Sequence, residues 1–145
     1  MSRRTSISKA LAEKLKSIDG TTLYKTNIFG NAYSYLKFWD EINDFPAVYM
    51  TNGTEVREYH PGGFAWGYLN VSLKVYTKGE DSGQQLEDLL EDVETVINNN
   101  RQLVYDLDNN YETTEILITS ITTDEGLLAP YGIGEINLQV RYQVL

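Results

Sequence analysis

Apolar positions recur with two different periods along the chain, and the longer period predicts two helices. In residues 5–18 the apolar side chains return every three or four positions, which places them on one helical face. The same spacing returns in residues 82–98, where Ser82 followed by Gln85 fits a capping box. We therefore expect one helix near the N-terminus and a second one after the middle of the chain.

Alternation of apolar and polar positions predicts the strands, most clearly in residues 64–78. Aliphatic side chains fill one parity of that segment, whereas the other parity includes Trp66, Tyr68 and Tyr76. A sheet with one face on a core produces this pattern, and the aromatic residues suggest that the second face is half-buried against a neighbour. Further strands are expected at residues 23–27, 46–50, 55–59, 115–123 and 135–145, with a hairpin turn at 51–53 and loops at 60–63 and 126–134.

The order of these elements predicts a single α+β domain over residues 1–145. The expected architecture is an antiparallel or mixed sheet with both helices packed on one face. The chain is 41% hydrophobic, which suffices for one core at this length. No run of about 20 apolar residues is present, so we expect a soluble protein that is assembled in the cytoplasm.

Few residue types for catalysis or metal binding are available. The sequence has no cysteine and a single histidine, His60, which excludes thiol chemistry and multi-histidine metal sites. Residues 106–110 resemble the start of a calcium loop, but Tyr111 stands where glycine is needed and Leu117 where a bidentate glutamate is needed. We expect no enzyme, no catalytic residues, no metal and no cofactor.

Charge is unevenly distributed in this acidic chain, whose formal net charge is −9. Five of its twelve basic residues lie in the first 16 positions, and this asymmetry suits head-to-tail association of identical copies. Residues 79–100 contain no basic residue. Their acidic surface is either solvated, faces a basic partner or lines an acidic channel, and its candidate residues are Glu87, Asp88, Glu91 and Asp92.

Three groups of residues are candidates for an interface between subunits or with a partner. They are the basic start of the first helix, the aromatic parity of the long strand and the apolar loop 126–134, which either folds back on its own domain or docks on a partner. The candidates are Arg3, Arg4, Lys9, Trp66, Tyr68, Tyr76, Leu127, Leu128 and Tyr131.

Taken together, several of these segments resemble the tail terminator (tail completion) proteins of tailed bacteriophages. The resemblance spans nearly the whole chain and rests on residues 45–50, 53–55, the strand 66–76 and the acidic helix 82–98. It implies a homo-hexameric ring that sits on the last ring of the tail tube, stops tube growth and contacts the neck or head-completion protein. A sheath protein is a further implied partner where the tail is contractile.

The resemblance also implies that the protein lies in the virion, at the junction of tail and neck. DNA would pass through the ring without specific binding, and no membrane would be involved. Two alternatives stay open: a neck (head-tail joining) or tail-tube protein of similar build, and a monomeric α+β adaptor or small-ligand-binding domain. Assembly distinguishes them, because a terminator stops at one ring, a tube protein forms long tubes and an adaptor stays monomeric.

Overall fold

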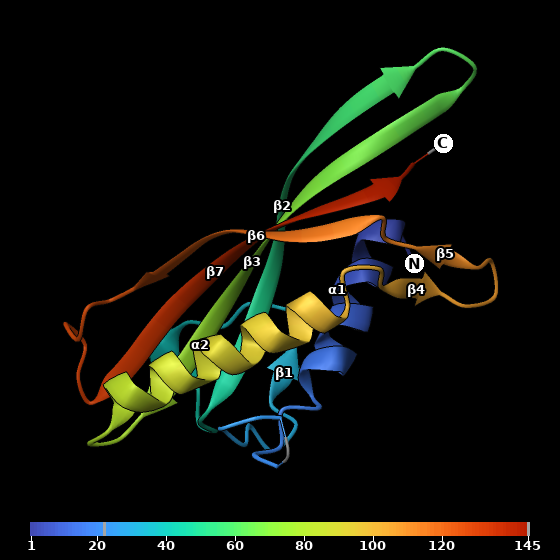
Figure 1. Ribbon diagram of the computed structural model, residues 1–145. Helices are drawn as coiled ribbons and strands as arrows, with labels where there is room; N and C mark the ends of the chain where they lie inside the picture. The colour runs from blue at the N-terminus through green and yellow to red at the C-terminus, as the bar shows by residue number, and fades with distance from the viewer. Residues whose placement is uncertain (22, 145) are drawn as a thin grey trace.

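Two helices cover one face of a five-stranded sheet in the computed structural model, which describes residues 1–21 and 23–144 (Figure 1). The strand order is β1-β2-β3-β7-β6, and all neighbours are antiparallel except β1 and β2. The predicted α+β class is confirmed. The helices are α1 (Arg3–Leu15) and α2 (Ser82–Asn99), and a 3-10 turn spans Trp39–Glu41. The strands are β1 (Ala32–Tyr33), β2 (Ala47–His60), β3 (Phe64–Lys78), β4 (Val104–Asp106), β5 (Tyr111–Glu112), β6 (Glu115–Thr123) and β7 (Tyr131–Gln143).

One core lies between the helices and the sheet. The aliphatic parity of β3 is fully buried there, as its alternation predicts. Apolar stripes of α1 and α2 pack on the same cluster, and each buried aliphatic side chain stabilises the fold by about 1.5–3 kcal/mol. The central members are Ile7, Leu11, Leu15, Leu69, Val71, Leu73, Val75, Leu86, Leu89, Val93 and Ile97.

Both helices begin differently from the sequence-based expectation. Ser2 caps α1 by accepting the Thr5 backbone N–H at 3.1 Å, so this helix starts two residues earlier than predicted. The predicted capping box of α2 is wrong, because Ser82 already belongs to the helix and Asp81 is its N-cap. The carbonyl of Ser82 instead accepts a hydrogen bond from the Thr77 hydroxyl, which ties the helix start to the end of β3.

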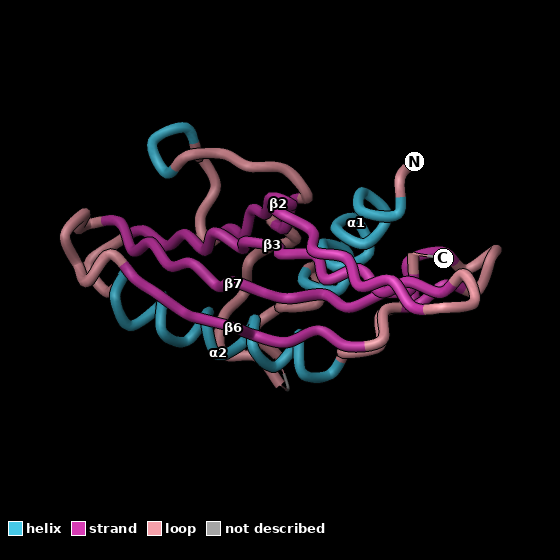
Figure 2. Tube along the Cα trace, turned by 90° about the horizontal axis from the view of Figure 1, so that it is seen from above, coloured by secondary structure: helices cyan, strands magenta, loops and turns pink. Residues whose placement is uncertain are grey.

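The second face of the sheet is covered over only part of its length. Residues 33–45, which include the 3-10 turn, lie across the sheet on the side opposite α2 (Figure 2). A small apolar cluster forms beneath this segment from Ile42, Ala47, Tyr49 and Tyr76. The rest of that face carries no covering element among the described residues.

The predicted hairpin turn at residues 51–53 is wrong. β2 continues through this segment with a register irregularity between Asn52 and Glu55, and the chain reverses only at Pro61–Gly63. Gly62 and Gly63 have φ values of 91° and 79°, which glycine adopts without a Cβ clash. A bulge of this kind absorbs an extra residue without reversing the strand, so the turn-forming composition of 51–53 marks a bend instead.

One other predicted strand is absent, and the start of another differs from the expectation. Residues 23–27 form no strand, since only an isolated bridge joins Asp19 to Asn27. β7 begins at Tyr131 and not at residue 135, so the predicted loop 126–134 shrinks to a turn over 124–130. Leu145, the last residue of the predicted strand, lies outside the described residues. The short β4–β5 hairpin was not anticipated from its sequence.

Candidate assembly surface

A two-stranded arm, residues 51–68, projects from the sheet beyond both helices (Figure 1). It consists of the second half of β2, the turn and the first part of β3. Residues 47–50 of β2 are buried, whereas most positions from 53 to 60 are exposed. Val56 and Tyr59 are 58% and 64% exposed, so the arm presents apolar surface on a regular ladder.

Trp66 and Tyr68 form one surface with Arg141 on the face of the arm away from the helices. The guanidinium carbon of Arg141 lies 4.1 Å from the centre of the Trp66 ring and 5.8 Å from that of Tyr68. Phe64 packs edge-on against Trp66, with 4.8 Å between ring centres. Stacking with a guanidinium fixes these rings in place, so they form a preorganised surface of aromatic and cationic character. The Nε of Arg141 is buried and makes no hydrogen bond within the part of the chain described.

A buried carboxylate holds the base of the arm. Glu55, next to the β2 irregularity, accepts hydrogen bonds from the Tyr142 hydroxyl and from Nε of Arg57, the latter at 2.8 Å. Burial is the main cause that raises the pKa of Tyr142, and its hydrogen bond to Glu55 is the second. On the other side of the irregularity, Arg4 donates to the Gly53 carbonyl. The direction of the arm is therefore fixed by side chains of α1, β2 and β7.

Both arginines predicted for an interface at the start of α1 are half-buried and bond to their own chain, and their place in an interface stays a prediction. The guanidinium of Arg3 donates to the carbonyls of Gln143 and Val144, at 3.1 and 2.8 Å, and lies 4.7 Å from the centre of the Tyr111 ring. Arg4 is held at the base of the arm. Both therefore satisfy backbone carbonyls of their own chain, and Lys9 is the exposed member of the predicted trio.

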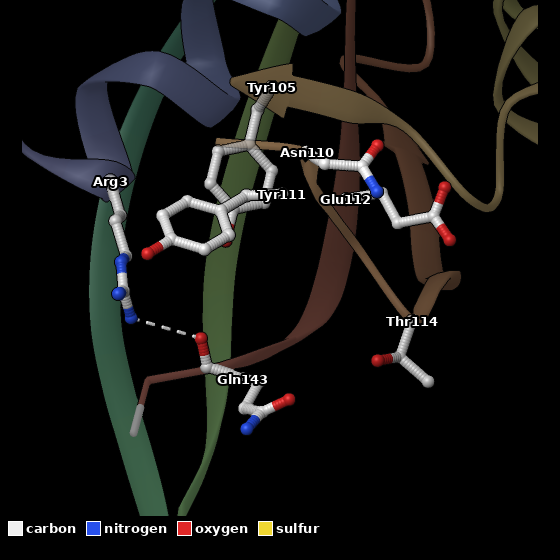
Figure 3. Close-up of a pocket in the computed structure, with 7 residues that line it drawn as sticks. All are labelled: Arg3, Tyr105, Asn110, Tyr111, Glu112, Thr114 and Gln143. Atoms are coloured by element: carbon white, nitrogen blue, oxygen red, sulfur yellow. Dashed lines mark hydrogen bonds between the residues drawn. The ribbon is translucent and has the colours of Figure 1, made fainter. Parts of the chain in front are cut away.

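The Arg3 side chain occupies one side of a hollow of about 410 Å³ between α1, the β4–β5 hairpin and the end of β7 (Figure 3). Arg3 and Tyr111 lie side by side there, and Tyr105 closes the wall behind them. Burial raises the pKa of the Tyr105 hydroxyl. Asn110, Glu112, Thr114 and Gln143 complete the lining of the hollow. The bonds of Arg3 to the Gln143 and Val144 carbonyls connect the two ends of the chain at this place.

The remaining predicted interface residues separate into buried and exposed ones. Tyr76 is buried beneath residues 33–45 and its hydroxyl donates to the Lys37 carbonyl at 2.8 Å, so it is not available to a partner. Tyr131 is half-buried against Trp39, with 4.9 Å between ring centres. Leu127 is 84% exposed on the turn 124–130, so it does not fold back on its own domain, whereas Leu128 beside it is only 36% exposed.

The acidic candidates on α2 also do not share one environment. Asp92 is buried, and its carboxylate accepts the backbone N–H groups of Lys25 and Thr26 at 2.8–3.1 Å, which anchors the loop after α1. Its predicted place on an acidic surface is therefore wrong. Glu91 is exposed and pairs with the Lys25 ammonium at 2.9 Å. Glu87 and Asp88 line a shallow hollow between α2 and β6 of about 320 Å³.

The free edge of the sheet at β6 has no signal in the sequence. Leu117 and Ile121 are exposed on this strand, which is rich in isoleucine and threonine and contains no proline or lysine. β6 pairs with β7 on one side, and its other side has no strand partner among residues 1–21 and 23–144. The composition of residues 115–123 predicts a strand, but it does not predict that this strand lies at the edge of the sheet.

Chemistry-bearing clusters are sparse in the described part of the chain. No group of three or more histidine, aspartate or glutamate residues there is arranged to hold a metal ion. His60 lies at the tip of the arm, where its ring contacts Glu58 at 2.6 Å. None of the described helices has the length and apolar character needed to cross a membrane.

Similarity to known proteins extends over the whole chain. Residues 1–145 match the sequence model of a family described as Bacteriophage Tail Tube Terminator Protein. "Tail tube terminator protein p142" of Escherichia phage T5 is 40% identical over 153 residues, which cover 99% of this chain and 95% of that protein. A chain of the solved "Virion of native gene transfer agent (GTA) particle" has a TM-score of 0.56 at 13% identity and 94% coverage of both chains, so this likeness shows the fold alone.

Proposed function

The chain belongs to the bacteriophage tail tube terminator family, and on this premise we propose that it caps the tail tube and ends tube growth. It is a structural protein of the virion tail. The phage T5 relative is named for this role, and the two sequences align over nearly their full lengths. We propose no catalytic activity, since the role of a terminator is met by shape and by surface complementarity.

A homo-hexameric ring is the form in which we propose that the protein acts. The observation that carries this step is the arm, a two-stranded ladder with Val56 and Tyr59 exposed and with an aromatic surface that the monomer leaves half-exposed. The free edge of β6, with Leu117 and Ile121 exposed, is a different surface, on the opposite side of the sheet from β2. Two unlike surfaces on one molecule favour head-to-tail contacts, which close into a ring when the rotation permits.

The proposed partners lie on the two flat sides of such a ring. One side contacts the tail tube protein and the other the neck or head-completion protein, with a sheath protein as a further partner in a contractile tail. The exposed carboxylates of Glu87 and Glu91 and the half-buried one of Asp88 support a role in letting DNA pass, because carboxylates repel phosphates and provide no counter-charge for binding. DNA is therefore a molecule in transit and not a specific ligand.

The test is an assembly experiment with tail tubes and tail tube protein of the same phage. Native mass spectrometry of the purified protein, alone and with tubes, is expected to give a species of six subunits. Electron microscopy is expected to place one ring at tube ends, and the addition of the protein to polymerising tube protein is expected to arrest elongation.

Three results would contradict the proposal. Long tubes formed by this protein alone would make it a tube protein. Binding all along a tube would remove the capping role. A protein that stays monomeric and does not bind tubes would favour the alternative of a monomeric adaptor. A Glu13→Gln variant is the control for nonspecific effects of substitution. It is expected to assemble like the natural protein, since Glu13 is an exposed residue on α1.

A further inference from the structure

The four long strands form a sheet that is open at both sides. One open side is β6, whose outer edge has no strand partner in the described chain. The other is the arm portion of β2, since β1 pairs only with Val48 and Tyr49. Unpaired strand edges present rows of N–H and C=O groups, and natural proteins usually guard them with lysine, proline or a covering element.

The two edges have similar lengths, and both carry exposed apolar side chains. The β6 edge comprises the nine residues Glu115–Thr123 and carries exposed apolar side chains without a lysine or proline guard. The arm edge, residues 51–60, is of similar length and also carries exposed apolar side chains, Val56 and Tyr59. Pairing of the two edges would satisfy their backbone groups and remove these side chains from water.

Strand direction shows how two copies would meet. β2, β3, β7 and β6 alternate in direction, because each neighbouring pair among them is antiparallel. A rotation axis along the strands keeps β2 of the next copy parallel to β2 of the first. The alternation then makes β6 and that next β2 antiparallel, which continues the same pattern across the junction.

From these observations we propose that β6 of one copy pairs in antiparallel fashion with the arm edge of β2 in the next copy. The occupant of each open edge is thus a second copy of this chain. The inference rests on the proposed ring and names the contact that closes it. Each subunit uses its two different edges once, so no edge is left free in a closed ring.

Disulfide trapping tests the pairing directly, because the natural sequence contains no cysteine. One variant carries Leu117→Cys on β6, and three others carry Thr54→Cys, Val56→Cys or Glu58→Cys on the arm. Each variant has a single cysteine, so no disulfide can form within one copy. Any disulfide that forms is therefore between copies.

Mixing the β6 variant with each arm variant in the assembled ring is expected to give a disulfide-linked dimer with at least one of them. Its yield is expected to exceed that of either variant alone by about tenfold, because a β6 edge meets only an arm edge. A mixture of Leu117→Cys with the exposed α1 variant Glu13→Cys is the matched control, and we expect only its background yield.

Two outcomes overturn the pairing. A ring that yields no dimer above the control with any arm position shows that other surfaces close it, while the proposed function stands. A dimer from Leu117→Cys alone shows that two β6 edges meet about a two-fold axis. Failure of the proposed function itself is seen separately, as absence of the ring and of tube capping in the unmodified protein.

Discussion

β2 and β3 each pass through two regions with opposite properties, the body of the sheet and the arm. In the body, residues 47–50 are buried on both faces, between the helices on one side and residues 33–45 on the other. In the arm the same two strands continue, but most of β2 faces water. The body accounts for the stability of the fold, whereas the arm adds length that the fold itself does not require.

The arm remains ordered because it is not an isolated ribbon. A two-stranded ribbon alone is marginally stable in water, but β7 runs beside the arm as far as the pair Trp66–Gln143. Glu55 and Arg4 then fix its base from two sides. Substitutions in the body should therefore change the free energy of unfolding, whereas those on the arm should change assembly.

The largest effect is expected in the body, from Leu73→Ala. Leu73 is fully buried on the central strand between the sheet and the helices. Loss of its side chain leaves a cavity, and such substitutions lower the free energy of unfolding by about 2–5 kcal/mol. Urea denaturation of the purified protein measures this change. A loss below 1 kcal/mol would show that the body is less tightly packed than the comparison requires.

The junction of the two regions is next, and Glu55→Gln tests it. The amide keeps the shape of the side chain but removes the charge that strengthens its hydrogen bonds with Tyr142 and Arg57. We expect the free energy of unfolding to fall by about 1–3 kcal/mol. The control is Glu58→Gln, an exposed carboxylate on the same strand, with an expected change within about 0.5 kcal/mol. Equal losses of unfolding free energy in the two variants would show that Glu55 has no special role at the base of the arm.

A smaller effect in the body is expected from Tyr76→Phe and from alkaline pH. The variant loses the hydrogen bond to the Lys37 carbonyl, which contributes about 1 kcal/mol. Burial raises the pKa of Tyr76 to about 12, above its usual value of 10.0. The unfolded chain therefore loses this proton first, so the stabilisation is complete below pH 10 and decreases as pH rises toward 12.

Urea titrations at several pH values between 9 and 12 measure this decrease. We expect the free energy of unfolding to fall less steeply with pH in Tyr76→Phe than in the natural protein, because a tyrosine with a raised pKa has been removed. Identical slopes would show that Tyr76 ionises as easily in the folded protein as in the unfolded chain.

Hydrophobic periodicity predicts much of the body and little of the arm. The bounds of β3 and β6 and the apolar stripes of both helices follow from the sequence because core burial imposes a strict period. The arm is different, since residues 51–53 have turn-forming composition and yet continue the strand through an irregularity. The bond of Glu55 to Tyr142, 87 residues away, and that of Arg4 to the Gly53 carbonyl stabilise this bend, and no local pattern reports such contacts.

The candidate surface was predicted in part for the same reason. Trp66 and Tyr68 were identified from strand parity, but their partner Arg141 lies on β7 and is visible only once the sheet is assembled. Arg3, Arg4 and Asp92 have the charge of interface residues, yet each bonds to backbone groups of distant segments. Tyr76 shares the parity of Trp66 but lies under residues 33–45, whose covering position leaves no periodic signal.

The smallest effect on stability is expected at the arm, from Tyr59→Ser. Tyr59 is 64% exposed, so its replacement should change the free energy of unfolding by no more than about 0.5 kcal/mol. If the arm serves assembly, the same change should weaken ring formation about tenfold, because an aromatic side chain central to an interface contributes more than 1 kcal/mol. Leu107→Ser is the control, since Leu107 is 82% exposed at the tip of the β4–β5 hairpin. Native mass spectrometry over a dilution series compares the two variants. Equal weakening would assign the effect to general loss of apolar surface, whereas a loss confined to Tyr59→Ser would separate assembly from folding within a single pair of strands.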